Sequence, residues 1–330
     1  MYFEAASQAP MEIRPLLVFY GMMALAKAVV CGRSLRSLST LNQAHGLSDV
    51  SPHGARLAEL RMKVDGRGTF QNFNDLICGL DGLNYFHRAM TETIPLRTAQ
   101  SAEIDQLEMT LKDILSRTAG AEDLYRETFE EPAGTLPFIL HLHGGPEEQV
   151  DLRIDLPELY DDPASIGRLI GATRERFPML RNWRFDRANK AWDRSIFVLV
   201  NCQVFDDEFL PESLVERDGG FEYQRGMARA ETIDFRPLVL PVIRGMSGTS
   251  PSLTEPVGGR YIADASLKYA GMYLLSSLVR YRPQTWVHSV ARMDTVERPA
   301  DDAALSLVEY FMGSAQSTFV ALANRLLTKT

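Results

Sequence analysis

The stretch RPLLVFYGMMALAKAVVCGR, residues 14–33, carries one charged residue, Lys27, between its two terminal arginines. Its length approaches the roughly 20 apolar residues that cross a bilayer. Three features argue against a membrane span: Lys27 near the end of the stretch, Gly21 in its middle, and the lack of a second apolar segment of this length. Apolar residues on nearly every side predict a helix buried in a core. Pro15 suits its first turn, where a missing N–H is harmless.

The overall composition is that of an ordinary globular chain. The 330 residues are 45% hydrophobic and 24% charged, which supplies enough apolar surface for a sizeable core. The net charge of −8 provides no general attraction to nucleic acid, so we expect no nucleic-acid partner unless a local basic patch supplies one.

The cysteines and the N-terminal residues bear on the cell compartment. Cys31, Cys78 and Cys202 lie far apart and form no CxxC pair, which argues against a structural zinc site. A sparse, odd number of cysteines is typical of a reducing compartment. The first residues, MYFEAASQAP, lack the basic region of a signal peptide. We therefore expect a cytoplasmic protein without a membrane partner.

Helical and strand-like patterns alternate in the first part of the chain. We predict a buried helix over 11–31 that stops at Gly32. RMKV and TFQNF, on either side of Asp65-Gly66, predict a short hairpin. Apolar residues at helical spacing predict another helix across SAEIDQLEMTLKDILSR, residues 101–117.

The pattern changes near residue 132. TLPFILHLHGG and QVDLRIDL predict strands, a helix follows between 163 and 180, and WRFDRANKAWDRSIFVLVNCQVF predicts a hairpin with its turn near 187–190. FRPLVLPVIRG and GGRYIADA are candidates for further strands. Helices return in SLKYAGMYLLSSLVRY, which ends before Pro283, and in DDAALSLVEYFMGSAQSTFVALANRLL.

These patterns predict a mainly helical α+β fold in which helices from both chain ends pack together around a mixed α/β segment in the middle. We divide the chain into a mainly helical N-terminal part with a short hairpin over 1–130, a central α+β part over 131–265, and C-terminal helices over 266–330 that pack on the N-terminal part. We expect these parts to form one compact unit.

Short segments along the chain match the pattern of one family in order. YFEAA and EIRPLLVFYGMMALAKA fit a PLLxFYGM core followed by Lys-Ala, AHGLS fits a His-Gly segment, and MKVDGRGTF fits a V-x-V…G-x-F hairpin. TLKDILSR, DLYRETF, YLLSSLVRYRPQTW and LSLVEYFM fit its later segments. On these motifs the chain resembles the YaaC-like proteins, a bacterial family, over almost its whole length, with a poor match at 130–265.

The resemblance implies an architecture and a bacterial cytoplasmic setting. The resemblance assigns no catalytic residues to this chain. The context in which proteins of this family occur suggests a role in stress response or phage defence. The chain begins almost at the first motif, so an N-terminal part often present in such proteins is expected to be absent.

Four polar residues stand in apolar surroundings within the family-like segments: Lys27, His45, Arg280 and Tyr281. A charged side chain in such a setting usually needs a partner. Three carboxylates are candidates for an internal network, which we favour: Glu309, Asp49 and Glu4. The alternative is a pocket for an anionic ligand. If the chain ends pack together, we expect Lys27, His45 and Arg280 to converge on one site. An anionic group must then balance the positive charge of that site.

Arg282 and His288 raise a different hypothesis. Their R-x₅-H spacing lies within the Arg-x(4–6)-His pattern of HEPN-type ribonucleases, which are small helical proteins. A guanidinium beside an imidazole can stabilise a phosphate while the imidazole acts as base. Pro283, directly after Arg282, should break the helix that this geometry needs.

His141 and His143, in FILHLHGG, suggest two further kinds of site. A strand followed by His-Gly-Gly occurs in α/β-hydrolases, but RGMSGTS, with Ser247, does not complete a G-x-S-x-G elbow. An H-x-H pair on a strand can bind a metal with help from Asp151 or Asp155, although a structural role is commoner, and we assign no metal.

The leading interpretation is a non-catalytic cytoplasmic protein that binds a protein partner or a small anionic ligand and needs no cofactor. A HEPN-like ribonuclease is the alternative, and a hydrolase using the HLHGG turn is third.

Overall fold

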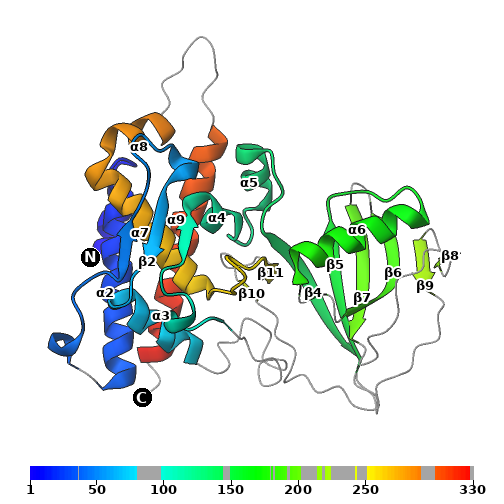
Figure 1. Cartoon of the computed structure of the whole chain (residues 1–330), viewed down its shortest axis with the longest axis horizontal. Helices are drawn as coiled ribbons and strands as arrows, with labels where there is room; N and C mark the ends of the chain where they lie inside the picture. Colours follow the sequence, from blue (N-terminus) through cyan, green and yellow to red (C-terminus); the bar gives the residue numbers. More distant parts are fainter. Residues whose placement is uncertain are drawn as a thin grey trace, which may run out of the picture.

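A computed structural model describes the chain at residues 1–35, 37–79, 98–143, 149–178, 180, 183–191, 194–201, 214–217, 220–223, 242–243, 251–290 and 302–327. The fold is mainly helical α+β, as the sequence predicts (Figure 1). It has two parts, which we call the helical unit and the sheet unit, and each surrounds a hydrophobic core of its own.

The helical unit combines elements from both ends of the chain. Its helices are α1 (Tyr2–Gln8), α2 (Arg14–Ser34), α3 (Thr69–Gly79), α4 (Leu111–Ser116), α5 (Glu122–Phe129), α7 (Asp264–Tyr281), α8 (Pro283–Val290) and α9 (Asp302–Leu327). A small antiparallel sheet lies against them, with strands β1 (Leu47–Asp49), β2 (Arg61–Val64) and β3 (Glu108–Thr110) in the order β1-β2-β3.

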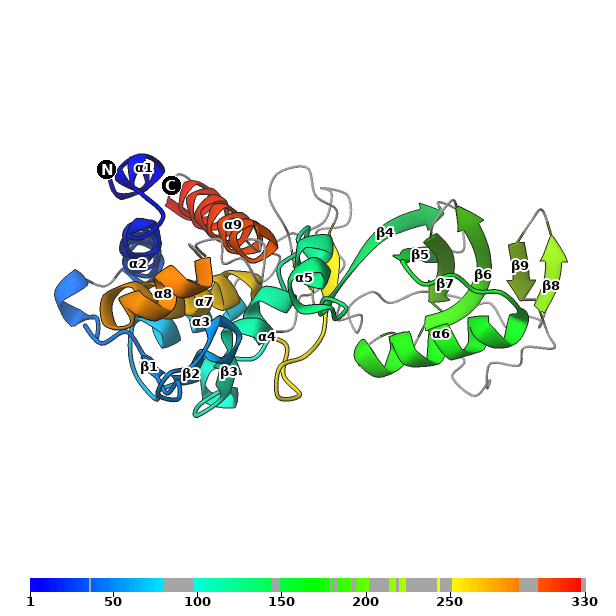
Figure 2. The ribbon, with the colours of Figure 1, turned by 90° about the horizontal axis from the view of Figure 1, so that it is seen from above.

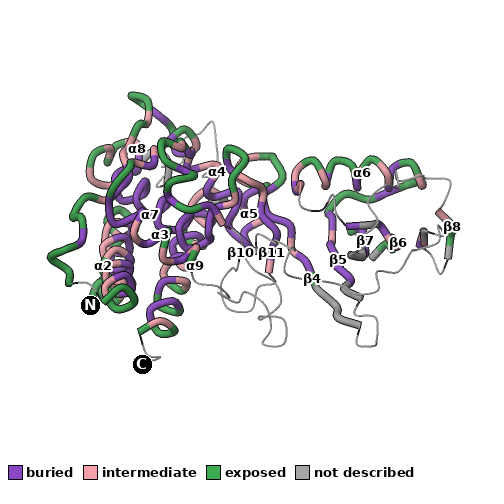
Figure 3. The backbone as a smooth tube through the Cα atoms, turned by 60° about the horizontal axis from the view of Figure 1, so that its bottom comes forward, coloured by how far each residue is buried: buried purple, intermediate pink, exposed green. Residues whose placement is uncertain are grey.

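The sheet unit is built on one antiparallel sheet in the order β10-β11-β4-β5-β7-β6-β9-β8. Its strands are β4 (Thr135–His143), β5 (Gln149–Leu156), β6 (Trp183–Ala191), β7 (Arg194–Asn201), β8 (Leu214–Arg217), β9 (Gly220–Tyr223), β10 (Val242–Ile243) and β11 (Ser252–Thr254). Helix α6 (Pro163–Arg176) covers one face of this sheet (Figure 2). Its Ile166 and Ile170 pack on strand residues such as Phe138 and Leu152. Figure 3 shows that the outer side of α6 is exposed while the strands beneath it are buried.

The apolar stretch of the N-terminal region is α2, and it packs against α1, α7 and α9. Phe19 is 0% exposed, and at Gly21 an added Cβ would lie 2.6 Å from the ring of Phe3, so this glycine lets α1 lie close. Among the described residues α2 is the one helix with the length and composition of a membrane span, and 44% of its apolar window is buried within the structure. It continues past Gly32 and ends where Leu35 takes a left-handed conformation, because Gly32 keeps helical geometry.

Helices from the two chain ends share one core, as predicted. Helix α7 lies against α2, α3 and α9, and nearly all its residues are buried. A buried ion pair lies inside this core: Lys268 Nζ donates to Asp264 Oδ2 at 2.7 Å and to Thr318 Oγ1 of α9 at 2.8 Å. Burying so much of α7 requires partners from both ends of the sequence.

The predicted hairpin around Asp65-Gly66 is wrong in its second half. RMKV is β2, but it pairs with β1 and β3, whereas TFQNF begins helix α3. Phe70, Phe73 and Ile77 follow a helical period and are all buried. Five residues were too few to separate this period from strand alternation.

The helix predicted across 101–117 is also wrong for most of its length. The segment forms a short 3-10 turn, strand β3 and then α4, which starts after Thr110. The Thr110 side chain accepts from the backbone N–H of Asp113 at 3.0 Å, and the Asp113 carboxylate accepts from the Thr110 N–H at 2.9 Å. This reciprocal capping box begins the helix there and leaves the preceding residues to pair with β2.

Two predictions in the sheet unit need correction. Residues 187–190 lie within β6, which pairs with β7 as far as Ala191–Arg194, so the hairpin turn comes later than expected. GGRYIADA adds no strand: Gly258 and Gly259 form a turn closed by a bridge between Val257 and Arg260, and α7 begins at Asp264.

Candidate functional site

Three aromatic rings meet where α2 and α7 pack together. The ring centroid of Phe19 in α2 lies 5.9 Å from that of Tyr273 in α7. The ring centroid of His45, in the segment before β1, lies 5.6 Å from that of Phe19 and 5.7 Å from that of Tyr273. His45 is therefore held between one helix from the start of the chain and one from its end. Burial raises the pKa of Tyr273, so its hydroxyl keeps its proton.

Backbone hydrogen bonds and two glycines hold the His45 segment. The N–H groups of Thr69 and Phe70, at the start of α3, donate to the carbonyls of Ala44 and His45 at 2.9 Å each. Gly46 has a φ of +81°, which favours glycine. A Cβ at Gly68 would lie 2.2 Å from the Gly46 nitrogen, so the two family-like segments AHGLS and GRGTF pack backbone to backbone.

The surroundings of His45 disfavour its protonated form. Burial lowers the pKa of His45, and the nearby positive charges of Arg280 and then Lys27 lower it further. Its Nδ1 is buried and has no hydrogen-bond partner among the described residues. Contacts with α9 place Lys27 level with the start of α7, whereas Arg280 lies in the last turn of that helix. Both charges act on His45, and we call these three residues the cationic site.

The two cations of this site lack a carboxylate partner in the part of the chain that is described. Lys27 Nζ donates to Gln43 Oε1 at 3.3 Å. The guanidinium carbon of Arg280 lies 4.9 Å from the ring centroid of Tyr281, and its Nε is buried without a partner among the described residues. Arg280 occupies the last turn of α7, where a cation also interacts favourably with the helix dipole.

The carboxylates that the sequence offered for a network are engaged elsewhere. Glu309 pairs with Arg14 at 3.2 Å, and Asp49 accepts from Ser277 at 3.0 Å. Glu4 lies 3.8 Å from the amino group of Met1. The favoured network of Lys27 and Arg280 with Glu309 or Asp49 is therefore wrong for the described residues, because each acid has a nearer donor on another element.

A surface cavity of about 750 Å³ opens at the junction of α7 and α8. We call it the α7–α8 cavity. Tyr273, Ser277 and Tyr281 line it from successive turns of α7, and His53 and Thr285 line it from the loop after β1 and from α8. Tyr273 contacts His45, and Tyr281 lies against Arg280, so the cationic site borders this cavity through two shared neighbours.

Arg282 and His288 are separated by a helix break. Helix α7 ends at Tyr281, Arg282 caps it, and Pro283 begins α8, which carries His288. The Arg282 guanidinium donates to the carbonyls of Pro52 at 2.7 Å and Ser51 at 3.1 Å and lies 3.7 Å from Asp49. These bonds tie the end of α7 to the loop after β1. The side chain of His288 lies outside the described residues.

His141 and His143 occupy alternate positions of β4, as predicted, and His141 pairs in register with Asp151 of β5. Their side chains, the glycines that follow them and Ser247 lie outside the described residues. Among the described residues no group of three metal-ligating side chains forms. Neighbouring strands of this sheet run antiparallel, whereas the nucleophile elbow belongs to the mostly parallel sheets of α/β folds, so the hydrolase interpretation lacks its structural setting.

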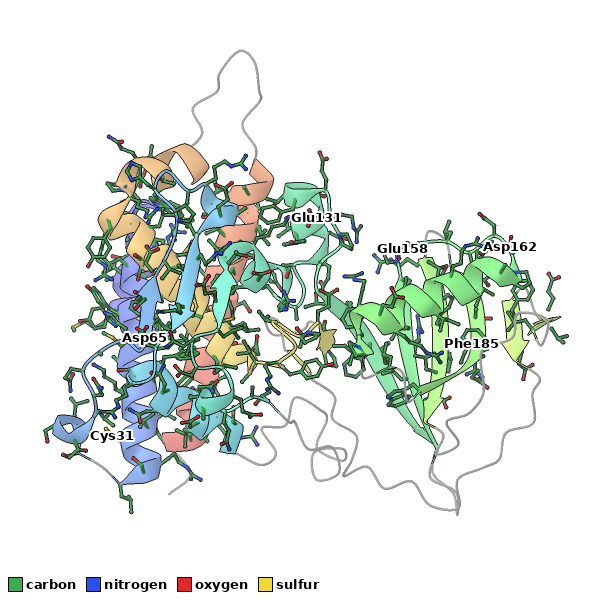
Figure 4. All side chains as sticks on the ribbon, viewed as in Figure 1. Cys31, Asp65, Glu131, Glu158, Asp162 and Phe185 are labelled. Atoms are coloured by element: carbon green, nitrogen blue, oxygen red, sulfur yellow. The ribbon has the colours of Figure 1, made fainter. Side chains whose placement is uncertain are left out.

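Charged residues also meet where the two units join. Glu255 pairs with Arg176 at 2.6 Å and with Arg117 at 3.7 Å, and Arg117, 8% exposed, donates to the Glu255 and Pro256 carbonyls at 2.9 Å each. A cavity of about 540 Å³ lies here, with Glu158 in its wall. Figure 4 shows Glu158 on the sheet unit facing Glu131 on the helical unit. These guanidinium groups have carboxylate partners, which indicates a structural joint.

Sequence reasoning missed this joint and the Asp264–Lys268 pair. For the pair a signal existed, because an aspartate and a lysine four residues apart in an apolar helix are neighbours on one face. For the joint there was none, since Arg117 and Glu255 are 138 residues apart in the chain.

Comparison with known proteins places the chain in a family. A family profile described as YaaC-like protein matches residues 1–327. The chain therefore belongs to the YaaC-like protein family, in agreement with the motifs quoted above. No curated protein and no solved structure matched it.

Proposed function

We propose that this YaaC-like protein is a non-catalytic binding protein whose cationic site receives a small anionic ligand. The supporting observation is that Arg280, whose charge acts on His45, has no carboxylate partner among the described residues and keeps a buried Nε without a hydrogen-bond partner there. Arg280 offers guanidinium N–H groups suited to phosphate or carboxylate, and Lys27 adds a point charge. A bacterial cytoplasmic setting and a role in stress response or phage defence belong to the same proposal.

Two buried atoms of the partly buried site support a ligand. A buried polar atom without a partner costs free energy, and both His45 Nδ1 and Arg280 Nε are such atoms. An anion bound at Arg280 accepts from Nε–H and offsets the positive charge that, after burial, lowers the pKa of His45.

Thermal unfolding with and without inorganic phosphate tests the proposal. Phosphate should raise the melting temperature of the wild-type chain, by an amount equivalent to about 2.7 kcal/mol at 100 times the dissociation constant. Arg280→Ala should abolish most of this increase because it removes the bidentate donor.

Arg168→Ala is the matched control, since it removes one positive charge from the exposed side of α6, far from the site. It also corrects for the general stabilisation that phosphate gives to folded proteins by exclusion from their surface. Equal phosphate stabilisation of wild type, Arg280→Ala and Arg168→Ala would contradict the proposal.

The HEPN-like ribonuclease is the second candidate, and Arg282 is the observation that bears on it. A catalytic arginine must be free to reach the phosphate, but Arg282 is held by two carbonyls and lies near Asp49. We therefore expect no cleavage when the purified chain is incubated with mixed RNA. Cleavage by the wild type that disappears in His288→Ala would reverse this preference.

A further inference from the structure

Three exposed leucines lie around the end of helix α2. Leu35, which caps α2, is 93% exposed, and Leu38, in the short 3-10 turn that follows, is 56% exposed. Leu327, the last residue of α9, is 36% exposed, and its side chain lies 2.8 Å from the position of a Cβ added at Gly32. Helices α2 and α9 therefore end side by side, near the C-terminus (Figure 1). We call Leu35, Leu38 and Leu327 the leucine patch.

Basic residues accompany this patch. Arg33 is exposed in the last turn of α2, and Arg325 is exposed in the last turn of α9. The two stretches of sequence that carry these helix ends, 13–48 and 310–330, contain six lysines and arginines and no aspartate or glutamate, although the whole chain has a net charge of −8. The leucine patch is thus carried by the acid-free stretches of an otherwise acidic protein.

The fold itself accounts for the arginines but not for the leucines. A cation in the last turn of a helix interacts favourably with the helix dipole. Leu35 has a φ of +54°, in the left-handed region where a helix cap is usually Gly or Asn. A leucine at such a cap gains no packing when its side chain is 93% exposed. The leucine patch is therefore apolar surface without a partner inside the described structure.

The charge beside the patch decides between its potential partners. A second copy of the chain would bring Arg33 and Arg325 of one copy near those of the other, and facing like charges disfavour such an interface. An anionic lipid bilayer meets both features, because exposed leucines insert at the boundary of the acyl chains while arginines contact the lipid phosphates.

We infer that the chain binds to the surface of an anionic lipid bilayer through the leucine patch, with Arg33 and Arg325 on the phosphates of the headgroups. This inference is independent of the proposed function, since it uses other residues. It departs from the sequence-based expectation of no membrane partner, which rested on the lack of a span and of a signal peptide. Binding from one side needs neither, and α2 stays packed in the helical unit.

Cosedimentation of the purified full-length chain with lipid vesicles tests the inference. One set of vesicles is phosphatidylcholine alone, and the other is an equimolar mixture of phosphatidylcholine and phosphatidylserine. The chain should pellet with the mixed vesicles and much less with phosphatidylcholine, because each basic residue near an anionic surface raises binding about five-fold. Salt at about 1 M, where the Debye length is only about 3 Å, should remove most of this preference.

Two variants and two matched controls locate the surface. Leu35→Asn should weaken binding to the mixed vesicles by at least about 10-fold, and Arg33→Gln by about five-fold. Asn suits the left-handed conformation of residue 35, so the melting temperature should not fall, which serves as the folding check. The controls Leu159→Asn and Arg168→Gln remove an exposed leucine and an exposed arginine from the sheet unit and should bind as the wild type does.

Three outcomes would overturn the inference. The first is no pelleting with either set of vesicles. The second is equal weakening by Leu35→Asn and Leu159→Asn, which would mean that the patch is not the binding surface. The third is a wild-type dimer, measured by light scattering, that Leu35→Asn converts to a monomer, since a second copy would then cover the patch.

Discussion

The two cations on α7 have opposite surroundings. Lys268, near the start of the helix, is 2% exposed and donates to Asp264 and Thr318. Arg280, in the last turn, lies against the Tyr281 ring and has no carboxylate partner among the described residues. The fold thus provides an acid for one cation of this helix and none for the other.

The difference separates a charge that belongs to the core from one that is available to a ligand. Lys268 lies where water does not reach, so its charge requires an acid from the same helix. Arg280 lies at the end of the helix, partly buried, against the ring of the exposed Tyr281. The same distinction applies to Arg117 and Arg176, which share Glu255 at the joint between the two units.

Breaking the buried pair should have the largest effect. Asp264→Ala leaves the buried charge of Lys268 without its carboxylate, and should lower the free energy of unfolding by about 3–5 kcal/mol. Urea unfolding followed by circular dichroism measures this loss. The double variant Asp264→Leu with Lys268→Met should recover most of it, because apolar residues of similar size replace the pair. A small loss in Asp264→Ala would mean that the pair is not essential to the core.

Displacing the His45 segment should have the next largest effect. Gly68→Ala places a Cβ against the Gly46 backbone and should cost about 1–3 kcal/mol of unfolding free energy. It should also weaken the phosphate response, because His45 moves relative to Arg280. Gly171→Ala is the control, because nothing lies within 4 Å of its added Cβ in α6. Its free energy of unfolding should be unchanged or higher by up to about 1 kcal/mol. Equal effects of the two substitutions would contradict close packing at Gly68.

Removing the unpaired cation should change stability little. Arg280→Ala loses one cation–π contact at a partly exposed site, worth about 0.5–1 kcal/mol. We expect less than about 1 kcal/mol of change in urea unfolding without ligand. A loss of unfolding free energy near that of Asp264→Ala would show that Arg280 has a structural partner. The contrast between Lys268 and Arg280 would then be wrong.

The smallest effect should appear in the pH dependence. The pKa of His45 is lowered in the folded chain, so the unfolded chain binds the proton more readily. The contribution of His45 to stability is complete above its unfolded pKa of about 6.5 and decreases as the pH falls from there towards the folded pKa. His45→Asn should remove this dependence, measured as the difference in unfolding free energy between wild type and variant from pH 7.5 to about 5.5. Phosphate should reduce it in the wild type, because a bound anion favours protonated His45.

Long periodic segments were predictable because their own residues carry the signal. Helices α2, α7 and α9 and strands β4 and β5 follow apolar patterns long enough to have one interpretation. TFQNF and the segment over 101–110 were mispredicted because short patterns fit both helix and strand. At 108–110, pairing with the distant strand β2 decided the outcome. In the cationic site, the residue types and the expectation that the chain ends meet came from the sequence, while the choice between an internal network and a ligand did not.

That choice depended on where the acids lie. The sequence alone determined that α2 is apolar around its circumference, that α7 needs burial, and that Lys27, His45 and Arg280 stand in segments typical of the YaaC-like family. Tertiary structure decided that Glu309 pairs with Arg14 and that Asp49 accepts from Ser277, which leaves Arg280 without an acid among the described residues. Pairing of charges depends on distances of a few ångströms between elements far apart in the chain, and such distances exist only once the helices have packed.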